Sequence, residues 1–163
     1  DPHFWLDPES VRRLLPPVVE ALCATRDAGC AGYRRRAAAF DAALEGLTRR
    51  TRKATEAVRA RPFVTAEPFL TWYAARFQLK VVAVVEPIPG KAPGPARLAE
   101  LVATTRREGA EVLFVQRQLP QHAAEALAEA TGLRPVALDP LGDGSSYEGL
   151  VDTLTQRLVE ALR

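Results

Sequence analysis

The chain has 163 residues, of which 47% are hydrophobic and 26% are charged, a composition typical of a globular protein with a core of its own. The formal net charge is only +2, and the basic residues are mixed with acidic ones, which argues against a nucleic-acid partner. No apolar run approaches the roughly 18 residues that span a bilayer, and no signal peptide is visible. Because the sequence contains no methionine, we expect a processed product or a fragment.

The first 30 residues are expected to form an extended start followed by two short helices. The opening octapeptide, D-P-H-F-W-L-D-P, suits neither a helix nor a strand, but it can fix one imidazole, that of His3, at the floor of a cleft. Pro16 and Pro17 remove two N–H donors, which predicts a break between the two helices. The second helix should end near Thr25.

Two cysteines, Cys23 and Cys30, lie near the end of this region. In one continuous helix their Cα atoms would be roughly 10 Å apart, too far for a disulfide. The stretch from Arg26 to Gly29, however, indicates a helix end and a new start, across which the two sulfurs could meet. The sequence therefore leaves two alternatives open: a disulfide formed in an oxidising, extracytoplasmic setting, or two small buried residues.

Residues 31–60 are predicted to form one long helix. They are rich in alanine and arginine, which favour helices, and contain no proline. Phe40, Leu44 and Leu47 mark a narrow apolar stripe, and the charged residues form a solvated face. About 28 helical residues would extend roughly 42 Å.

From residue 61 onward, short valine-rich segments alternate with amphipathic ones. Strands are predicted at 63–65, 80–85, 112–115 and 135–138, and helices at 68–77, 95–107, 120–131 and 147–162. Nearly continuous apolar strands that alternate with helices indicate an α/β fold, a parallel four-stranded sheet with helices on both faces.

Polar residues follow each predicted strand, where ligands of open parallel sheets bind. They are Glu67, Glu86, Gln116 and Asp139. A single polar residue at a strand end is more often a helix cap or a turn former. All four offer oxygen atoms, however, and three are carboxylic acids, so together they favour a cation site.

The opening octapeptide resembles the D-P-H-x-W-L-D-P signature of the zinc/manganese-type solute-binding proteins of ABC transporters, in which the histidine is a metal ligand. The segment F-V-T-A-E, residues 63–67, is similar to the strand that ends in that family's third ligand. The segment L-D-P-L, residues 138–141, is similar to its closing signature, in which the aspartate is the fourth ligand. The resemblance implies that His3, Glu67 and Asp139 bind the metal and that the chain has no catalytic residues.

The resemblance covers the family pattern from its second histidine to the C-terminus. It implies a remnant of the N-terminal lobe at 1–30, an inter-lobe helix at 31–60 and a C-terminal α/β lobe at 61–163. The first histidine of the family is missing with its lobe, and Gln116 stands where a glutamate is usual. His122, the other histidine, is expected to be an exposed helix residue.

The implied function is capture of manganese or zinc outside the cytoplasm, in the periplasm or at the outer face of the membrane, for delivery to the permease of an ABC transporter. One imidazole and two carboxylates can provide extra oxygen ligands when the carboxylates bind through both oxygens, which slightly favours manganese over zinc. The general affinity order of divalent metals favours zinc. The missing N-terminal lobe is the second expected partner. We expect this chain alone to bind metal weakly, because it offers at most three ligands and little holds His3 in place.

Two other classes of protein are compatible with an α/β fold. A nucleotide-binding enzyme would need a glycine-rich loop after its first strand, whereas E-P-F follows here, and the G-D-G-S-S segment at 142–146 is only a weak anion-binding signal. No nucleophile–base pair is recognisable, so we do not expect an enzyme. The remaining alternative is a receiver-like or protein-interaction module with no metal role.

Overall fold

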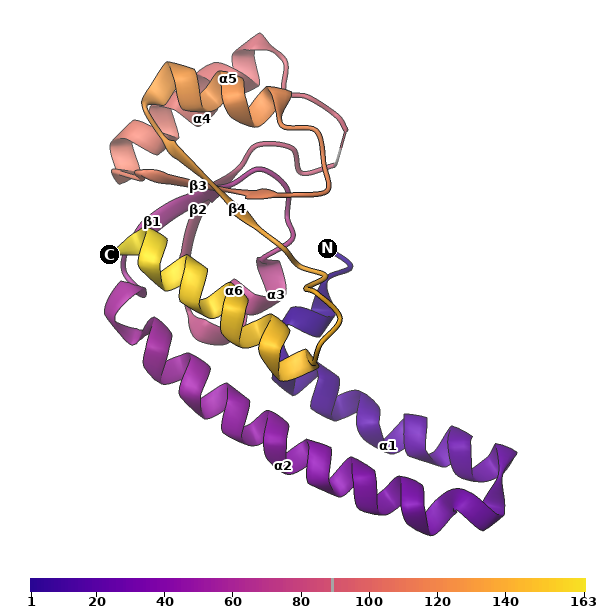
Figure 1. The fold of residues 1–163 in the computed structure, drawn as a ribbon. Coiled ribbons are helices and arrows are strands. Elements are labelled where there is room, and N and C mark those ends of the chain that lie inside the picture. The colour runs from indigo at the N-terminus through magenta and orange to yellow at the C-terminus, as the bar shows by residue number, and fades with distance from the viewer. Residues whose placement is uncertain (89) are drawn as a thin grey trace.

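A computed structural model describes residues 1–88 and 90–163 and shows a helical hairpin that projects from a layered α/β unit (Figure 1). The hairpin consists of α1 (Pro8–Thr25) and α2 (Cys30–Thr55), and a short 3₁₀ turn, Phe4–Leu6, precedes it. None of the described helices is both long and apolar enough to cross a membrane.

Helix α1 begins where the octapeptide ends. The Asp7 side chain caps the helix by accepting a hydrogen bond from the Glu9 amide, and a proline occupies the first helical position, where its missing N–H costs nothing. The predicted break at Pro16 and Pro17 is wrong, because α1 continues through both residues.

Tertiary contacts explain why α1 is continuous. Arg12, in the turn before the prolines, forms two hydrogen bonds with Asp41 of α2, at 2.9 and 3.0 Å. After the prolines, Cys23 is bonded to Cys30, and the Cα atoms are 4.7 Å apart across the turn at Asp27–Gly29. Both ends of α1 are therefore fixed on α2, and of the two alternatives for the cysteines the disulfide is confirmed.

The long predicted helix is confirmed as α2, whose 26 residues extend roughly 39 Å. A 3₁₀ turn, Glu56–Val58, follows it, so the α-helix is somewhat shorter than predicted. Leu44 and Leu47 of the apolar stripe are fully buried against the α/β unit, while Phe40 is only partly buried.

The α/β unit contains four parallel strands in the order β2-β1-β3-β4, which confirms the predicted fold class. The strands are β1 (Pro62–Thr65), β2 (Lys80–Val84), β3 (Val112–Gln116) and β4 (Arg134–Leu138). The helices are α3 (Thr71–Phe77), α4 (Pro95–Glu108), α5 (His122–Thr131) and α6 (Tyr147–Leu162).

Alternate residues of the strands face two apolar layers. Phe63 and Phe114 pack edge to face, with ring centroids 5.1 Å apart, in the layer that α2, α3 and α6 cover. Val64 and Leu113 point into the opposite layer, beneath α4 and α5. Because the sheet is buried on both faces, its strands read as continuous apolar runs in the sequence.

Candidate metal site

The strand order brings all four predicted polar residues to neighbouring strand ends. Glu67 follows β1, Gln116 ends β3 and Asp139 follows β4, and these strands are adjacent in the sheet. The Ala66 amide donates to the Phe114 carbonyl at 2.8 Å, so the parallel register continues past β1 and sets Glu67 beside Gln116. Glu86 follows β2, the edge strand on the far side of β1.

Glu67 is a buried carboxyl group with an unused oxygen. Its side chain is 2% exposed, and Oε2 has no hydrogen-bond partner. Burial, together with the nearby negative charge of Glu86, raises the pKa of Glu67. The group lines a cavity of about 430 Å³ that Glu86 and His122 also line. Because a buried charge without a partner is costly, the arrangement suits a group that binds a cation.

His3 lies just before the 3₁₀ turn, with its imidazole packed against two aromatic rings. The centroids are 5.1 Å from Trp5 and 6.3 Å from Phe69. The Nδ1 atom is 2.7 Å from the carboxylate of Asp1. A carboxylate only accepts hydrogen bonds, so the neutral imidazole donates through Nδ1, and its Nε2 atom keeps the lone pair that a metal ion requires.

Gln116 lies near both His3 and Glu67. It is 5% exposed, and its side chain influences the pKa of the imidazole and of the carboxyl group. Burial lowers the pKa of His3, which favours the neutral form that binds metals. His3 is therefore near the segment that follows β1, since its imidazole packs against Phe69, two residues beyond Glu67.

Asp139 has a different environment. Its Oδ1 atom accepts hydrogen bonds from Gln118 Nε2 at 2.7 Å and from the amides of Leu141 and Gly142 at 3.0 and 3.2 Å. Burial alone would raise the pKa of Asp139, but these hydrogen bonds and the charge of Arg117 outweigh it, so the pKa lies below its usual value. The residue lines a separate cavity of about 170 Å³.

Within residues 1–88 and 90–163, no group of three or more histidine, cysteine, aspartate or glutamate side chains is close enough to hold a metal ion. Of the three predicted ligands, Glu67 and Asp139 line separate cavities, and His3 lines neither of them. The side chain of His122 is 93% exposed, as expected for a helix residue.

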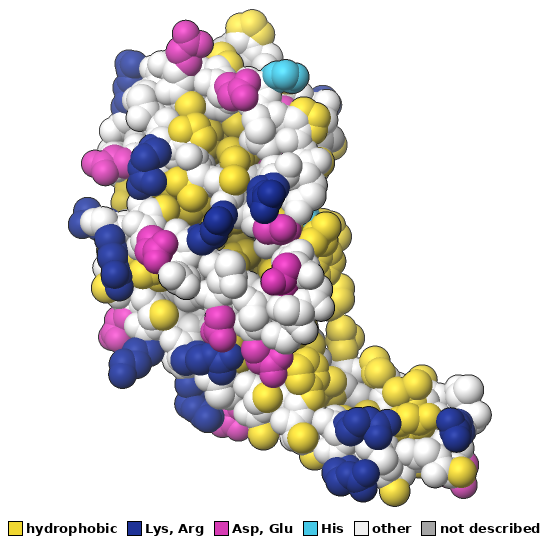
Figure 2. Space-filling view, in the orientation of Figure 1, with side chains coloured by type: hydrophobic (Ala, Val, Ile, Leu, Met, Phe, Trp, Pro, Cys, Tyr) yellow, Lys and Arg dark blue, Asp and Glu magenta, His cyan; other side chains and the backbone are white. Residues whose placement is uncertain are grey.

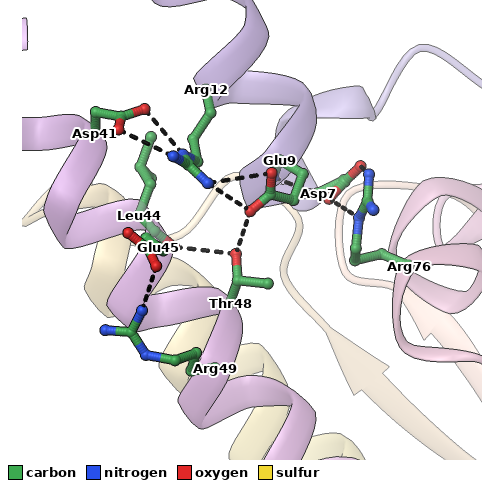
Figure 3. A network of polar contacts seen from close by, with 9 residues as sticks. All are labelled: Asp7, Glu9, Arg12, Asp41, Leu44, Glu45, Thr48, Arg49 and Arg76. Carbon is green, nitrogen blue, oxygen red and sulfur yellow. Dashed lines mark hydrogen bonds and ion pairs between the residues drawn. The ribbon is translucent and has the colours of Figure 1, made fainter.

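The expectation that little holds His3 is wrong. Figure 3 shows Asp7, four residues further on, beside Arg76 of α3, which donates to its carboxylate at 2.8 and 2.9 Å. The side chain of Asp7 is buried, and that of Leu6 lies in the core. Sequence reasoning missed these contacts because Asp7 and Arg76 are 69 residues apart. The spacing of Asp1 and His3, two residues apart, was the one local signal for the carboxylate–imidazole contact.

The parallel sheet, with the buried Glu67 carboxyl group at the end of β1, defines the class of α/β unit, and comparison with known proteins places the chain in a family. The family described as "ZnuA: Zinc-uptake complex component A periplasmic" matches residues 1–161. The chain therefore belongs to this family of periplasmic zinc-uptake components.

Individual relatives are similar over almost the whole chain. The high-affinity zinc uptake system protein ZnuA of Brucella abortus is 29% identical over 99% of this chain and 50% of its own length. The zinc-binding lipoprotein AdcA of Streptococcus pneumoniae is 26% identical over 86% of this chain and 28% of its own length. The crystal structure of a Zn(II)-bound AdcAII variant of Streptococcus pneumoniae superposes with a TM-score of 0.85, at 25% identity, over 100% of this chain and 61% of that one. The chain thus spans at most about half the length of these two curated relatives.

Proposed function

We propose that this chain is part of a protein that captures zinc outside the cytoplasm and delivers it to the membrane permease of an ABC transporter. The observation that carries the proposal is the buried Glu67 carboxyl group at the end of β1, whose Oε2 atom has no hydrogen-bond partner and which lines a cavity. A family match over residues 1–161 supports it. The role is that of an uptake component rather than an enzyme.

The ligand set is proposed to contain His3, Glu67 and Asp139. One imidazole nitrogen and carboxylate oxygens are donors that zinc accepts, and manganese accepts them too. The descriptions of the relatives name zinc, so we place zinc ahead of manganese for this chain. Asp139, held by the loop after β4, would complete the set from the other side of Gln116.

The division of the chain proposed from the sequence assigns 1–30 to the N-terminal lobe, 31–60 to the linking helix and 61–163 to the C-terminal lobe. An apolar stripe on α1 supports a further lobe in the full-length protein. Leu14, Val18 and Leu22 recur every four residues and are 43%, 51% and 43% exposed. Figure 2 shows hydrophobic side chains gathered on the projecting hairpin. We infer that the missing N-terminal lobe covers this stripe and supplies the remaining ligand.

The stiffness of helix α2 limits the motion that we expect between the two lobes of the full-length protein. Its 26 residues pack on α1 along one side and on α6 near its end, so it is a stiff connection. We therefore expect the two lobes of the full-length protein to tilt slightly on loading rather than to open widely. The permease would recognise the loaded arrangement.

Zinc titration of the full-length protein tests the proposal. Glu67→Gln removes the charge of the buried ligand at constant volume and should weaken zinc binding at least tenfold. Glu125→Gln, on the exposed face of α5, is the matched control and should bind like the wild type. Unchanged zinc affinity in Glu67→Gln would contradict the proposal and favour the protein-interaction alternative.

A further inference from the structure

Trp5 connects the His3 turn with the loop that follows Asp139. Its indole Nε1 donates to the carbonyl of Pro140 at 2.9 Å, across 135 residues of sequence. The carbonyl of Trp5 itself accepts a hydrogen bond from the Tyr147 hydroxyl at 2.7 Å. The indole also packs against the imidazole of His3, with ring centroids 5.1 Å apart. Trp5 therefore contacts His3, one proposed ligand, and also Pro140, the residue next to Asp139, another proposed ligand.

Tyr147 is well placed to fix this connection. It is the first residue of α6, and Phe40 of α2 packs edge to face on its ring, with centroids 5.9 Å apart. Burial raises the pKa of the Tyr147 hydroxyl, so the group remains a hydrogen-bond donor at any physiological pH. Because α2 packs against the ring, the direction of the Tyr147 hydroxyl is fixed by contacts other than the hydrogen bond to Trp5.

The same segment is anchored a second time, to the helix that follows Glu67. Trp72 Nε1 donates to the carbonyl of Asp1 at 2.9 Å, and Arg76 binds Asp7 through two hydrogen bonds. Both Trp72 and Arg76 belong to α3, only a few residues beyond Glu67. Residues on both sides of His3 are thus hydrogen-bonded to α3, which follows Glu67, and to the loop that follows Asp139.

We infer that Trp5 and Tyr147 are positioning residues, which hold His3 on the C-terminal α/β unit so that His3, Glu67 and Asp139 move together as one body. The inference rests on the proposed metal-binding function. It assigns residues 1–7 to the structural unit formed by 61–163 instead of to the N-terminal lobe. Release of the ion then requires this unit to separate from ligands outside the chain, while its own three ligands stay in place.

Removing one hydroxyl tests the inference with little disturbance of packing. Tyr147→Phe deletes the hydrogen bond to Trp5 and keeps the ring. Tyr73→Phe is the matched control, because the hydrogen bond of its buried hydroxyl is to Thr155 of α6, at 2.8 Å, and not to the segment that carries His3. Both variants are made in the full-length protein and compared by amide hydrogen exchange without metal and by zinc affinity.

We expect Tyr147→Phe to raise local exchange of the Leu6 and Asp7 amides about fivefold, since both are bonded within the anchored turn. Zinc affinity should fall about tenfold, the lower end of the range for residues that orient a ligand. Tyr73→Phe should change neither quantity. Trp5→Phe, which removes the indole N–H, should act in the same direction as Tyr147→Phe.

Equal exchange of the Leu6 and Asp7 amides in Tyr147→Phe and Tyr73→Phe would overturn the inference. Faster exchange of these amides combined with wild-type zinc affinity would also overturn it, because loosening the His3 segment would then have no effect on zinc binding. If the wild-type protein binds no zinc, the proposed function fails, and the exchange comparison alone decides whether Tyr147 fixes this segment.

Discussion

Replacement of Asp7 by asparagine should lower the free energy of unfolding by about 2 kcal/mol. The carboxylate is 2% exposed and accepts both hydrogen bonds of the Arg76 fork. Breaking a fully buried pair costs about 3–5 kcal/mol and a surface pair about 0–1 kcal/mol. The side chain of Arg76 is 26% exposed, so water replaces part of the loss and the expected value lies between these limits. Asparagine still caps α1, which isolates the effect of the charge.

Urea unfolding at pH 7 measures this loss, with Asp152→Asn as the control. The pair between Arg50 and Asp152 also has two close contacts, at 3.0 and 2.8 Å, but both side chains are nearly half exposed. The control should therefore lose no more than about 0.5 kcal/mol. If Asp7→Asn were no more destabilising than Asp152→Asn, the reasoning from burial would be refuted.

The pH dependence provides a second check on the same pair. Burial would raise the pKa of Asp7, but the hydrogen bonds from Arg76, Ser10 and the Glu9 amide outweigh it, and the pKa lies below its usual value. The stabilisation is therefore complete above the unfolded-state pKa of about 3.9 and is lost as the pH falls through the lower folded-state pKa. The difference between wild type and Asp7→Asn should stay constant from about pH 7 to pH 5 and shrink below about pH 4. A difference that persists undiminished at pH 2 would contradict this account.

Three further outcomes are expected. Burial raises the pKa of Glu67, so its ionised form destabilises the metal-free fold. The free energy of unfolding of Glu67→Gln should therefore exceed that of the wild type by about 1 kcal/mol at pH 7 and equal it at pH 4. A variant less stable than the wild type at pH 7 would contradict this expectation. Reducing the bond between Cys23 and Cys30 should lower the free energy of unfolding by about 2.5 kcal/mol in urea with reductant, as loop entropy predicts for a short loop, and an unchanged midpoint would argue against it. Leu44→Ala should cost about 3 kcal/mol in the same assay, because the side chain is fully buried, and a loss below 1 kcal/mol would mean that the core refills the space.

Local patterns were sufficient for most of the secondary structure. Val112–Gln116 reads as an apolar run because both faces of β3 are buried, and the long alanine- and arginine-rich segment became α2. The same local reasoning failed at Pro16 and Pro17, where it predicted a break. Contacts with α2 on both sides of the prolines stabilise α1 there, and the sequence of α1 alone could not predict them.

By itself, the sequence determined the fold class, the resemblance to a metal-capture family and the polar residues at the strand ends, because these depend on residue type and on spacing along the chain. Only the tertiary structure decided the order of the strands, and with it that Glu67 lies beside Gln116 while Asp139 has a cavity of its own. It alone also joined Trp5 to Tyr147, 142 residues away. Burial and hydrogen bonding between such distant residues arise when elements pack, so no periodicity in the sequence could have indicated them.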